Sequence, residues 1–312
     1  MSYWVCLFFC LCISANGKLK IPDHKISQYD SVVHTRFVAL NGIFFDGFLD
    51  LMSDEDWFIS SQGCVNCGDV SGKAYRVPIV LEADSPSAIT NLNQKATKGR
   101  IGFNTNFNLT SRLTSLFSNS DYFCLVTHVH IDEVEHKRDA CETANSVAGG
   151  PQMENIRAIA DITPNEGHFW QFQVQYAAYQ EFTSSAFFPT FEAILSSTTP
   201  YLHVPQELIK IMTTSLSESE TSPDGDVIIN CNYRFLGQPI VFYINGGLVS
   251  IESMFYTMRD HIDSNICALR MKALPEGETR WVLGAPFLEA VTVCLGLKVN
   301  DIYFAKNNQL HY

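Results

Sequence analysis

Two short polar turns hold the residues whose types could do chemistry. Asp50-Leu51-Met52-Ser53 follows the apolar run IFFDGFL, and Ser196-Ser197-Thr198-Thr199 follows FEAIL. A carboxylate that shares a proton with a second carboxylate can activate water as a general base. A hydroxyl cannot replace the second carboxylate, because it has no accessible anionic form near neutral pH. Of the two turns, only the first carries an acid, Asp50, that such chemistry could use, and the second carries hydroxyls alone.

A weak internal repeat links the two turns to two later segments. Ile101-Gly102 follows the first turn, and Val282-Leu283-Gly284 follows the second. Two similar β-rich lobes that each give one turn to a shared cleft would produce this pattern. We therefore expect the two turns to face each other.

The elements that must position these turns are mostly strands. Short runs rich in Val, Ile, Phe and Tyr alternate with Gly, Pro, Asn, Asp and Ser, which is typical of a mostly β protein. Such runs lie at residues 34–40, 43–51, 76–83, 121–131, 169–179, 226–233, 239–246, 281–285 and 301–306. Helical periodicity is scarce. Residues 205–216 predict one helix that begins at Pro205, and residues 109–119 predict a shorter one.

Composition and charge exclude several classes of partner. Of the 312 residues, 46% are hydrophobic and 17% are charged, which is typical of a globular chain with a substantial core. The formal net charge of -12 disfavours binding to nucleic acid or to an anionic membrane. We therefore expect no nucleic-acid partner, and no membrane partner once the N-terminal leader is removed.

The N-terminus predicts secretion. The run WVCLFFCLCI has the length of a signal-peptide core and is too short to span a bilayer, and SANG supplies small residues for cleavage before Lys18. We therefore expect residues 1–17 to be a signal peptide and the mature chain to be extracellular. A short buried helix or a membrane anchor is the alternative. The sequon that begins at Asn108 predicts glycosylation of a surface loop.

The cysteine count indicates disulfides in an oxidising compartment. Three of the ten cysteines precede residue 18, and seven remain: Cys64, Cys67, Cys124, Cys141, Cys231, Cys267 and Cys294. An odd number leaves at least one free thiol or one intermolecular bridge. Cys294 lies in the strand-like run AVTVCLGL and is our candidate for a buried free thiol, whereas Cys124 and Cys141 either pair with each other or stay free.

In order and approximate spacing, these segments resemble the pepsin-like aspartic protease family. The similarity is greatest in the last quarter, in VIINCNYRF, IVFYINGGLVSIESMFY, WVLGAPFLEAVTV and NDIYFAKNN. The resemblance implies a mostly β, bilobal pepsin-like fold with two β-rich lobes around a central cleft. It places the N-terminal lobe at residues 18–160 and the C-terminal lobe at 161–312. It implies neither a cofactor nor a metal.

The resemblance also assigns a role to each turn. The first turn is similar to the family's Asp-Thr-Gly-Ser motif and is followed by Trp57 at the family's spacing, but Leu51 and Met52 replace the Thr and the Gly. In the second turn Ser196 stands where the family has its second catalytic Asp, Ser197 where it has Thr, and Thr198 where it has Gly, while Thr199 keeps its hydroxyl. Side chains at positions 52 and 198 would crowd a place where Gly allows close approach. The resemblance therefore implies a degenerate and inactive member of the family.

Two cysteine pairings follow from the resemblance. Cys64 and Cys67 stand where the family has a short disulfide loop, and Cys231 and Cys267 where it has the disulfide of its C-terminal lobe. A CxxC pair can instead be redox-active or form half of a zinc site. However, the chain has no second CxxC, and no βαβ pattern surrounds this one.

Two other groups of residues could in principle do chemistry, but the sequence supports these interpretations less. The segment THVHIDEVEH brings together potential zinc ligands but equally fits a solvated hairpin; these residues are His128, His130, Glu133, Glu135 and His136. Ser196 or Ser197 with His203 would suggest a serine nucleophile, but no nucleophile elbow or third partner is present in the sequence.

The function that we expect is that of a secreted pseudo-protease that binds a peptide or protein in the interlobe cleft. One alternative is a weakly active aspartic endopeptidase in which Asp50 works with an unidentified second acid. Acids near Asp50 in sequence are Asp46, Asp54, Glu55 and Asp56. Another alternative is a secreted structural or antigenic protein whose cleft is filled by its own side chains, such as Met52.

Overall fold

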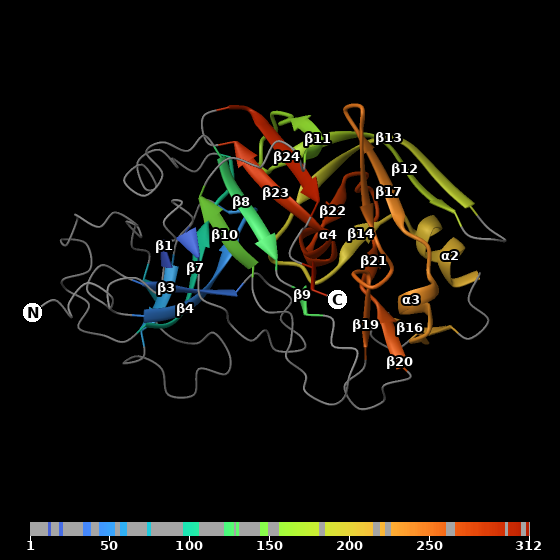
Figure 1. Ribbon diagram of the computed structural model, residues 1–312, viewed down its shortest axis with the longest axis horizontal. Helices are drawn as coiled ribbons and strands as arrows, with labels where there is room; N and C mark the ends of the chain where they lie inside the picture. Colours follow the sequence, from blue (N-terminus) through green and yellow to red (C-terminus); the bar gives the residue numbers. More distant parts are fainter. Residues whose placement is uncertain are drawn as a thin grey trace, which may run out of the picture.

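Strands dominate the chain, which confirms the prediction of a mostly β protein (Figure 1). The computed structural model describes the strands before residue 150 with the turn residues 51–53 and 103–105. It then describes residues 156–180, 185–214, 219–221, 226–259, 266–296, 299–306 and 310–311. The expected strand at 76–83 and the expected helix at 109–119 lie outside these residues. The strand β1 (Cys12–Ile13), which lies within the expected leader, pairs with β2 (Leu19–Lys20), which follows the leader.

The first half of the chain forms a five-stranded sheet, and the first turn follows its strand β4. In spatial order its strands are β3 (His34–Val38), β4 (Phe44–Asp50), β7 (Ala96–Gly102), β5 (Trp57–Ser60) and β6 (Ala74–Tyr75). Most neighbours are antiparallel, but β4 and β7 run parallel, with Asp50 opposite Gly102. This parallel pair brings the end of β4 beside the Ile101-Gly102 segment of the repeat.

The second half forms a seven-stranded sheet and a four-stranded sheet. The seven-stranded sheet contains, in order, β18 (Gly247–Ile251), β17 (Ile240–Ile244), β12 (Gln171–Gln180), β13 (Ser185–Leu195), β22 (Trp281–Leu283), β14 (Leu202–Val204) and β21 (Met271–Ala273). The four-stranded sheet contains β15 (Glu220–Thr221), β16 (Val227–Asn230), β20 (Ile266–Leu269) and β19 (Thr257–Arg259). Here β13 and β22 are parallel, with Leu195 opposite Leu283. This repeats the arrangement of β4 and β7.

A third large sheet, which we call the shared sheet, joins strands from both halves. Its order is β10 (Ala144–Ala148), β8 (Tyr122–Thr127), β23 (Val291–Gly296), β24 (Asp301–Lys306) and β11 (Ile156–Asp161). In Figure 1 the green β8 and β10 lie beside the red β23 and β24. A short parallel pair, β9 (Val129–His130) and β25 (Leu310–His311), adds a second link between distant segments.

The shared sheet corrects our interpretation of Cys294. This residue lies directly opposite Cys124 in the pairing of β23 with β8, and the two form a buried disulfide. The hypothesis of a free thiol at Cys294 is therefore wrong, and Cys124 does not pair with Cys141. The two cysteines pair because the register of β8 and β23 places them opposite each other. They are 170 residues apart, so the local sequence pattern could not predict the pair.

Three short helices lie among the described residues: α2 (Gln206–Thr214), α3 (Tyr233–Leu236) and α4 (Ala285–Ala290). The helix α2 confirms the prediction at 205–216. It buries Leu208, Ile209 and Met212 on one face, as an amphipathic helix against a sheet should. No helix in the described part of the chain is both long and apolar enough to cross a membrane.

A chain of aromatic contacts connects the seven-stranded sheet to the shared sheet. The Trp281 ring stacks on Phe191 at 4.3 Å between centroids and meets Phe242 edge-on at 6.0 Å. Phe242 in turn contacts Phe287 of α4, and Phe287 contacts Phe304 of β24, each pair at 5.8 Å. Such pairs contribute about 0.5–1.5 kcal/mol each beyond the burial of their area. They fix α4 between the two sheets.

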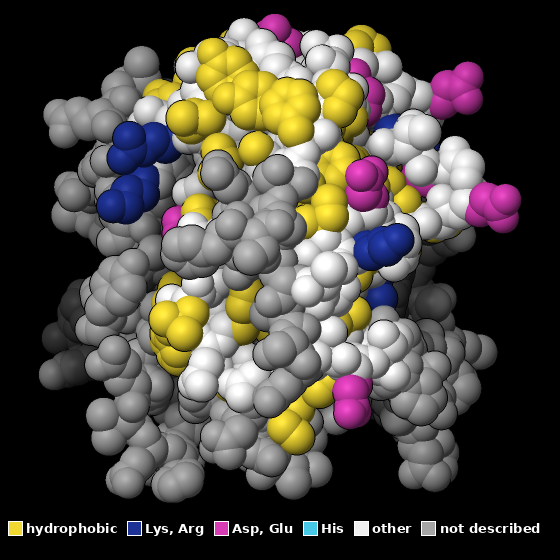
Figure 2. Space-filling model, turned by 90° about the vertical axis from the view of Figure 1, so that its right-hand side faces the viewer, with side chains coloured by type: hydrophobic (Ala, Val, Ile, Leu, Met, Phe, Trp, Pro, Cys, Tyr) yellow, Lys and Arg dark blue, Asp and Glu magenta, His cyan; other side chains and the backbone are white. Residues whose placement is uncertain are grey.

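Exposed aromatic rings cover part of the outer face of the seven-stranded sheet. Tyr176 stacks on Phe187 at 5.2 Å and on Tyr243 at 4.9 Å, and Phe187 remains 66% exposed. Figure 2, which shows the face on the right of Figure 1, has hydrophobic side chains gathered in its upper part.

A buried ion pair holds α4 against the loops beside the second turn. Arg270 donates two hydrogen bonds to the Glu289 carboxylate, at 2.5 and 2.9 Å. The same guanidinium also donates to the carbonyls of Phe255 and Pro200. Such a pair costs desolvation energy, and it stabilises the fold only while each partner keeps the other.

We expect Glu289→Leu to lower the free energy of unfolding by about 3 to 5 kcal/mol, because it leaves a buried guanidinium without its carboxylate. Urea unfolding measures this change. Glu278→Gln is the matched control, since the Glu278–Arg280 pair is partly exposed and should contribute less than about 1 kcal/mol. Equal effects of the two substitutions would contradict the role assigned to the buried pair.

We also expect peptide mapping without reduction to recover Cys124 linked to Cys294. A peptide with Cys141 linked to either residue would show that β8 and β23 do not pair in the register described. The Cys231–Cys267 peptide serves as the internal control, because that disulfide belongs to a separate sheet.

Candidate functional site

The first turn lies at the end of β4, where the parallel strand β7 supports it. The Phe103 amide donates to the Asp50 carbonyl at 2.7 Å, and the Asn104 amide donates to the Ser53 carbonyl at 3.0 Å. The Asp50 side chain is buried, with 6% of the residue exposed. The backbone of the turn is therefore fixed on both sides of the carboxylate.

The second turn lies at the end of β13 and has a similar support. The Ser196 amide donates to the Leu283 carbonyl at 3.1 Å, and the Ala285 amide donates to the Thr199 carbonyl at 3.0 Å. Gly284 allows this contact, because a Cβ at that position would lie 2.5 Å from the Thr199 carbonyl oxygen and 2.3 Å from that of Tyr201. Any side chain there would push the turn away.

Each turn contains an equivalent internal hydrogen bond, from a backbone amide to the side chain two residues earlier. In the first, the Met52 amide donates to Asp50 Oδ1 at 2.9 Å; in the second, the Thr198 amide donates to Ser196 Oγ at 3.4 Å. Ser196 therefore occupies in its turn the place that Asp50 occupies in the other. Its hydroxyl also contacts Thr198 Oγ1 at 3.2 Å, and only 1% of Ser196 is exposed.

A buried hydrogen bond joins the two turns directly. The Leu51 amide donates to Ser197 Oγ at 3.0 Å, between residues 146 positions apart. Both residues are fully buried. Leu51 has no side-chain hydroxyl that could accept a reciprocal hydrogen bond from the backbone of the second turn. The two turns are therefore joined by this hydrogen bond in one direction only.

The side chains of Met52 and Thr198 do not keep the turns apart. Both residues are only half-buried, and the contact between the turns forms one residue earlier, through Leu51 and Ser197. The crowding that the sequence predicted at positions 52 and 198 thus does not prevent the two turns from meeting.

Residues 165–170 connect the two turns and were missed by the sequence analysis. The Trp170 indole Nε1 donates to the Phe103 carbonyl at 2.5 Å, next to the first turn. The Trp170 carbonyl accepts from the Leu195 amide at 3.1 Å, next to the second turn. Asn165 shapes this segment through hydrogen bonds in both directions with the Phe169 backbone. The signal that could have revealed it is a lone Trp that precedes a strand and follows a polar turn.

His203 lies near the second turn but pairs with a threonine. Its Nε2 lies 3.1 Å from Thr199 Oγ1, so the imidazole contacts the last hydroxyl of the turn. Burial, together with the nearby positive charge of Lys272, lowers the pKa of His203 below its usual value. The hypothesis of a serine nucleophile gains no support from this arrangement, since the histidine bonds to neither Ser196 nor Ser197 in the hydrogen bonds observed.

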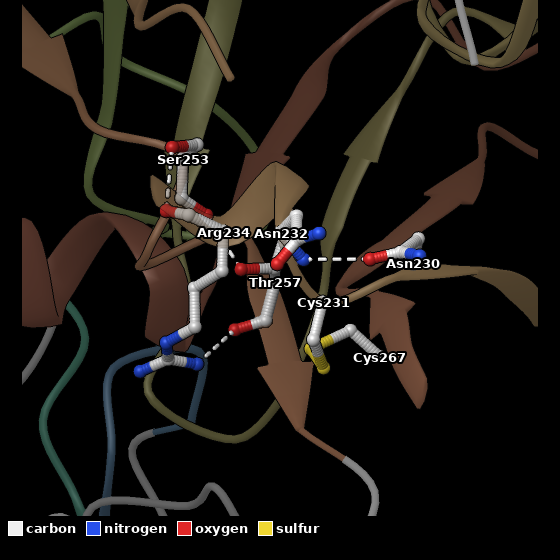
Figure 3. The surroundings of a disulfide bond; sticks show 7 residues. All are labelled: Asn230, Cys231, Asn232, Arg234, Ser253, Thr257 and Cys267. Carbon is white, nitrogen blue, oxygen red and sulfur yellow. Dashed lines mark hydrogen bonds between the residues drawn. A yellow bond between two sulfur atoms is a disulfide. The ribbon is translucent and has the colours of Figure 1, made fainter. Parts of the chain in front are cut away.

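The Cys231–Cys267 disulfide is present, as the resemblance implied. It links the end of β16 to β20, and Figure 3 shows it beside Asn230 and Asn232, whose amide donates to Asn230 Oδ1 at 2.9 Å. Several predictions lie outside the described residues: the Cys64–Cys67 pair, the sequon at Asn108 and most of the segment from His128 to His136. No grouping suited to a metal ion occurs within the part of the chain that the structure describes.

We expect Ser197→Ala to lower the free energy of unfolding by about 1 to 3 kcal/mol, because it leaves the buried Leu51 amide without its acceptor. Ser197→Thr keeps the hydroxyl and should restore most of this loss. Ser250→Ala, at an exposed serine, is the control and should change stability by less than about 0.5 kcal/mol. Urea unfolding of all three variants tests the hydrogen bond between the two turns, and a Ser197→Ala protein as stable as the parent would refute it.

The comparison with known families agrees with this geometry. A family model described as eukaryotic aspartyl protease matches residues 145–307, which is more than half of the 312-residue chain. The match includes the second turn, the disulfide Cys231–Cys267 and the segment around Gly284. It confirms the resemblance and the pepsin-like fold that the sequence predicted. This chain therefore belongs to the eukaryotic aspartyl protease family.

Proposed function

We propose that this protein is a pseudo-protease: a pepsin-fold member of its family that binds an extended peptide in the interlobe cleft without hydrolysing it. The observation that carries the proposal is the identity and setting of Ser196. This residue sits at the end of β13 in the place equivalent to Asp50, and its hydroxyl contacts Thr198. The second turn thus presents hydroxyls and no carboxylate.

The chemistry of the family explains why this change matters. Two carboxylates close together cannot both ionise easily, so they share a proton; one accepts a proton from water while the other donates to the substrate carbonyl. With Ser196 in the second position, the shared proton is lost. The equivalent position of the second turn then holds a hydroxyl, which can donate and accept hydrogen bonds but cannot carry the charge.

The retained scaffold supports a binding function. The Leu51–Ser197 bond and the Trp170–Phe103 bond still hold the two turns together. An extended peptide that enters a cleft above such turns gains affinity from main-chain hydrogen bonds, which need no catalytic acid. The step from fold to ligand class rests on analogy with the family.

We further propose that the protein is secreted. The apolar leader in residues 4–13 has the character of a signal peptide. The buried disulfides Cys124–Cys294 and Cys231–Cys267 are typical of proteins that fold in an oxidising compartment.

A weak peptidase is the second candidate, and the retention of Asp50 favours it. The carboxylate is buried at the end of β4 and accepts the Met52 amide. An acid supplied from another segment would be needed to complete a dyad. A direct assay separates the two candidates.

We expect the purified protein to show no peptide hydrolysis between about pH 3 and pH 7, a range that includes pH values at which paired carboxylates share one proton. A statine-type transition-state mimic should change nothing in this assay. Asp50→Ala is the matched variant: cleavage that the mimic inhibits and that this variant loses would overturn the pseudo-protease reading. The triple variant Ser196→Asp, Ser197→Thr, Thr198→Gly restores the family motif in the second turn and is the positive control for hydrolysis.

The binding half of the proposal needs its own readout. Native mass spectrometry of the protein with a peptide library should detect intact peptides bound, and the statine-type mimic should displace them. An absence of bound peptide with a folded protein would favour a structural role with a filled cleft.

A further inference from the structure

A pocket lies in the C-terminal half of the chain, away from the two turns. It has a volume of about 580 Å³, within the range of ligand pockets in proteins. Its walls come from the edge strand β18, the helix α3, the loop after β18, the start of β23 and the ends of β11 and β24. It contains no residue of either turn and none of residues 165–170.

The rim of this pocket carries an excess of positive charge, although the protein as a whole is acidic. Arg157, Arg234 and Lys306 line it, against one carboxylate, Glu252, whereas the whole chain has a formal net charge of -12. The Arg234 guanidinium donates to the Thr257 carbonyl at 2.9 Å (Figure 3). Arg157 and Lys306 form no ion pair with any residue that the structure describes. A local excess of cations of this kind attracts an anionic partner.

The local backbone places Arg157 and Lys306 on neighbouring strands at the same end of the shared sheet. In the pairing of β11 with β24, Ile156 lies opposite Ala305, and the register then shifts between Ile156 and Ala158. Arg157 is therefore the residue at a β-bulge, a feature that redirects a side chain. Lys306 follows Ala305 directly. Gly247 packs closely against this bulge, and only glycine fits there, because a Cβ at position 247 would lie 1.9 Å from the Arg157 carbonyl oxygen.

The pocket also exposes large apolar side chains beside the edge strand β18. Leu248 is 55% exposed and Phe235 is 57% exposed, and both line the pocket. Among the described strands, β18 pairs only with β17 and forms the edge of its sheet. Its residues Leu248, Val249 and Ser250 face the pocket. An edge strand whose residues line a pocket beside apolar side chains is suited to pairing with a strand from another chain.

We propose that this pocket binds an extended acidic peptide segment. The peptide backbone pairs with the outer edge of β18, its carboxylates lie near Arg157 and Lys306, and an apolar side chain packs on Leu248 and Phe235. A peptide fits these observations better than a small anion, because the site combines cations with a strand edge and apolar walls. This site is separate from the interlobe cleft and does not rest on the function proposed for it.

Fluorescence anisotropy with a labelled peptide of alternating glutamate and leucine tests the proposal. The double variant Arg157→Gln/Lys306→Gln should bind about tenfold more weakly, because it removes two rim charges. Leu248→Asp should weaken binding comparably through the apolar contact and the added negative charge. Lys210→Gln removes an exposed cation on α2 and should leave binding unchanged. Matching urea unfolding curves show that the variants are folded.

Four results would overturn the proposal. The first is unchanged affinity in the double variant; the second is equal binding of a peptide in which lysine replaces glutamate. The third is binding of dodecanoate at this site without binding of the acidic peptide, which would identify a lipid-like ligand instead. The statine-type mimic should not compete with the acidic peptide. Competition would place the peptide in the cleft and would refute a second site.

Discussion

The hydrogen bond from the Leu51 amide to the Ser197 hydroxyl is the contact on which the rest of the site depends. It is buried and joins positions 146 residues apart. To form it, β4 and β13 must end at the same place, and each does so beside a parallel strand, with Asp50 opposite Gly102 and Leu195 opposite Leu283. The Trp170 indole and the shared sheet then hold the two halves in this arrangement. The two turns of this aspartyl protease family member thus meet through a hydrogen bond in one direction only.

The replacement of an acid by Ser196 has opposite effects on the turn and on the chemistry. A serine oxygen still accepts the Thr198 amide, as Asp50 accepts the Met52 amide, so the backbone of the turn keeps its geometry. The site also avoids the repulsion between two close carboxylates. In the function that we propose, the same change also removes the shared proton that hydrolysis needs. One substitution would then leave the scaffold intact and abolish the reaction.

The sequence predicted those features that depend on local pattern. The β-rich composition, the helix α2 and the repeated turns with their following Gly segments are all local, and the family resemblance supplied Cys231–Cys267. Non-local register decided the rest. Cys124 pairs with Cys294 because β8 and β23 are neighbours, and Arg270 meets Glu289 because α4 packs beside the second turn. The effect of Met52 was misjudged because the turns meet one residue earlier, at Leu51.

The most direct test of the account is a crystal structure of the protein after long incubation with a peptide substrate of the family at acidic pH. The account predicts an intact peptide that spans the two turns, with its backbone near Asp50 and Ser196 and no second carboxylate in contact with Asp50. Cleaved products in the cleft, or a carboxylate from another segment within hydrogen-bond distance of Asp50, would contradict it.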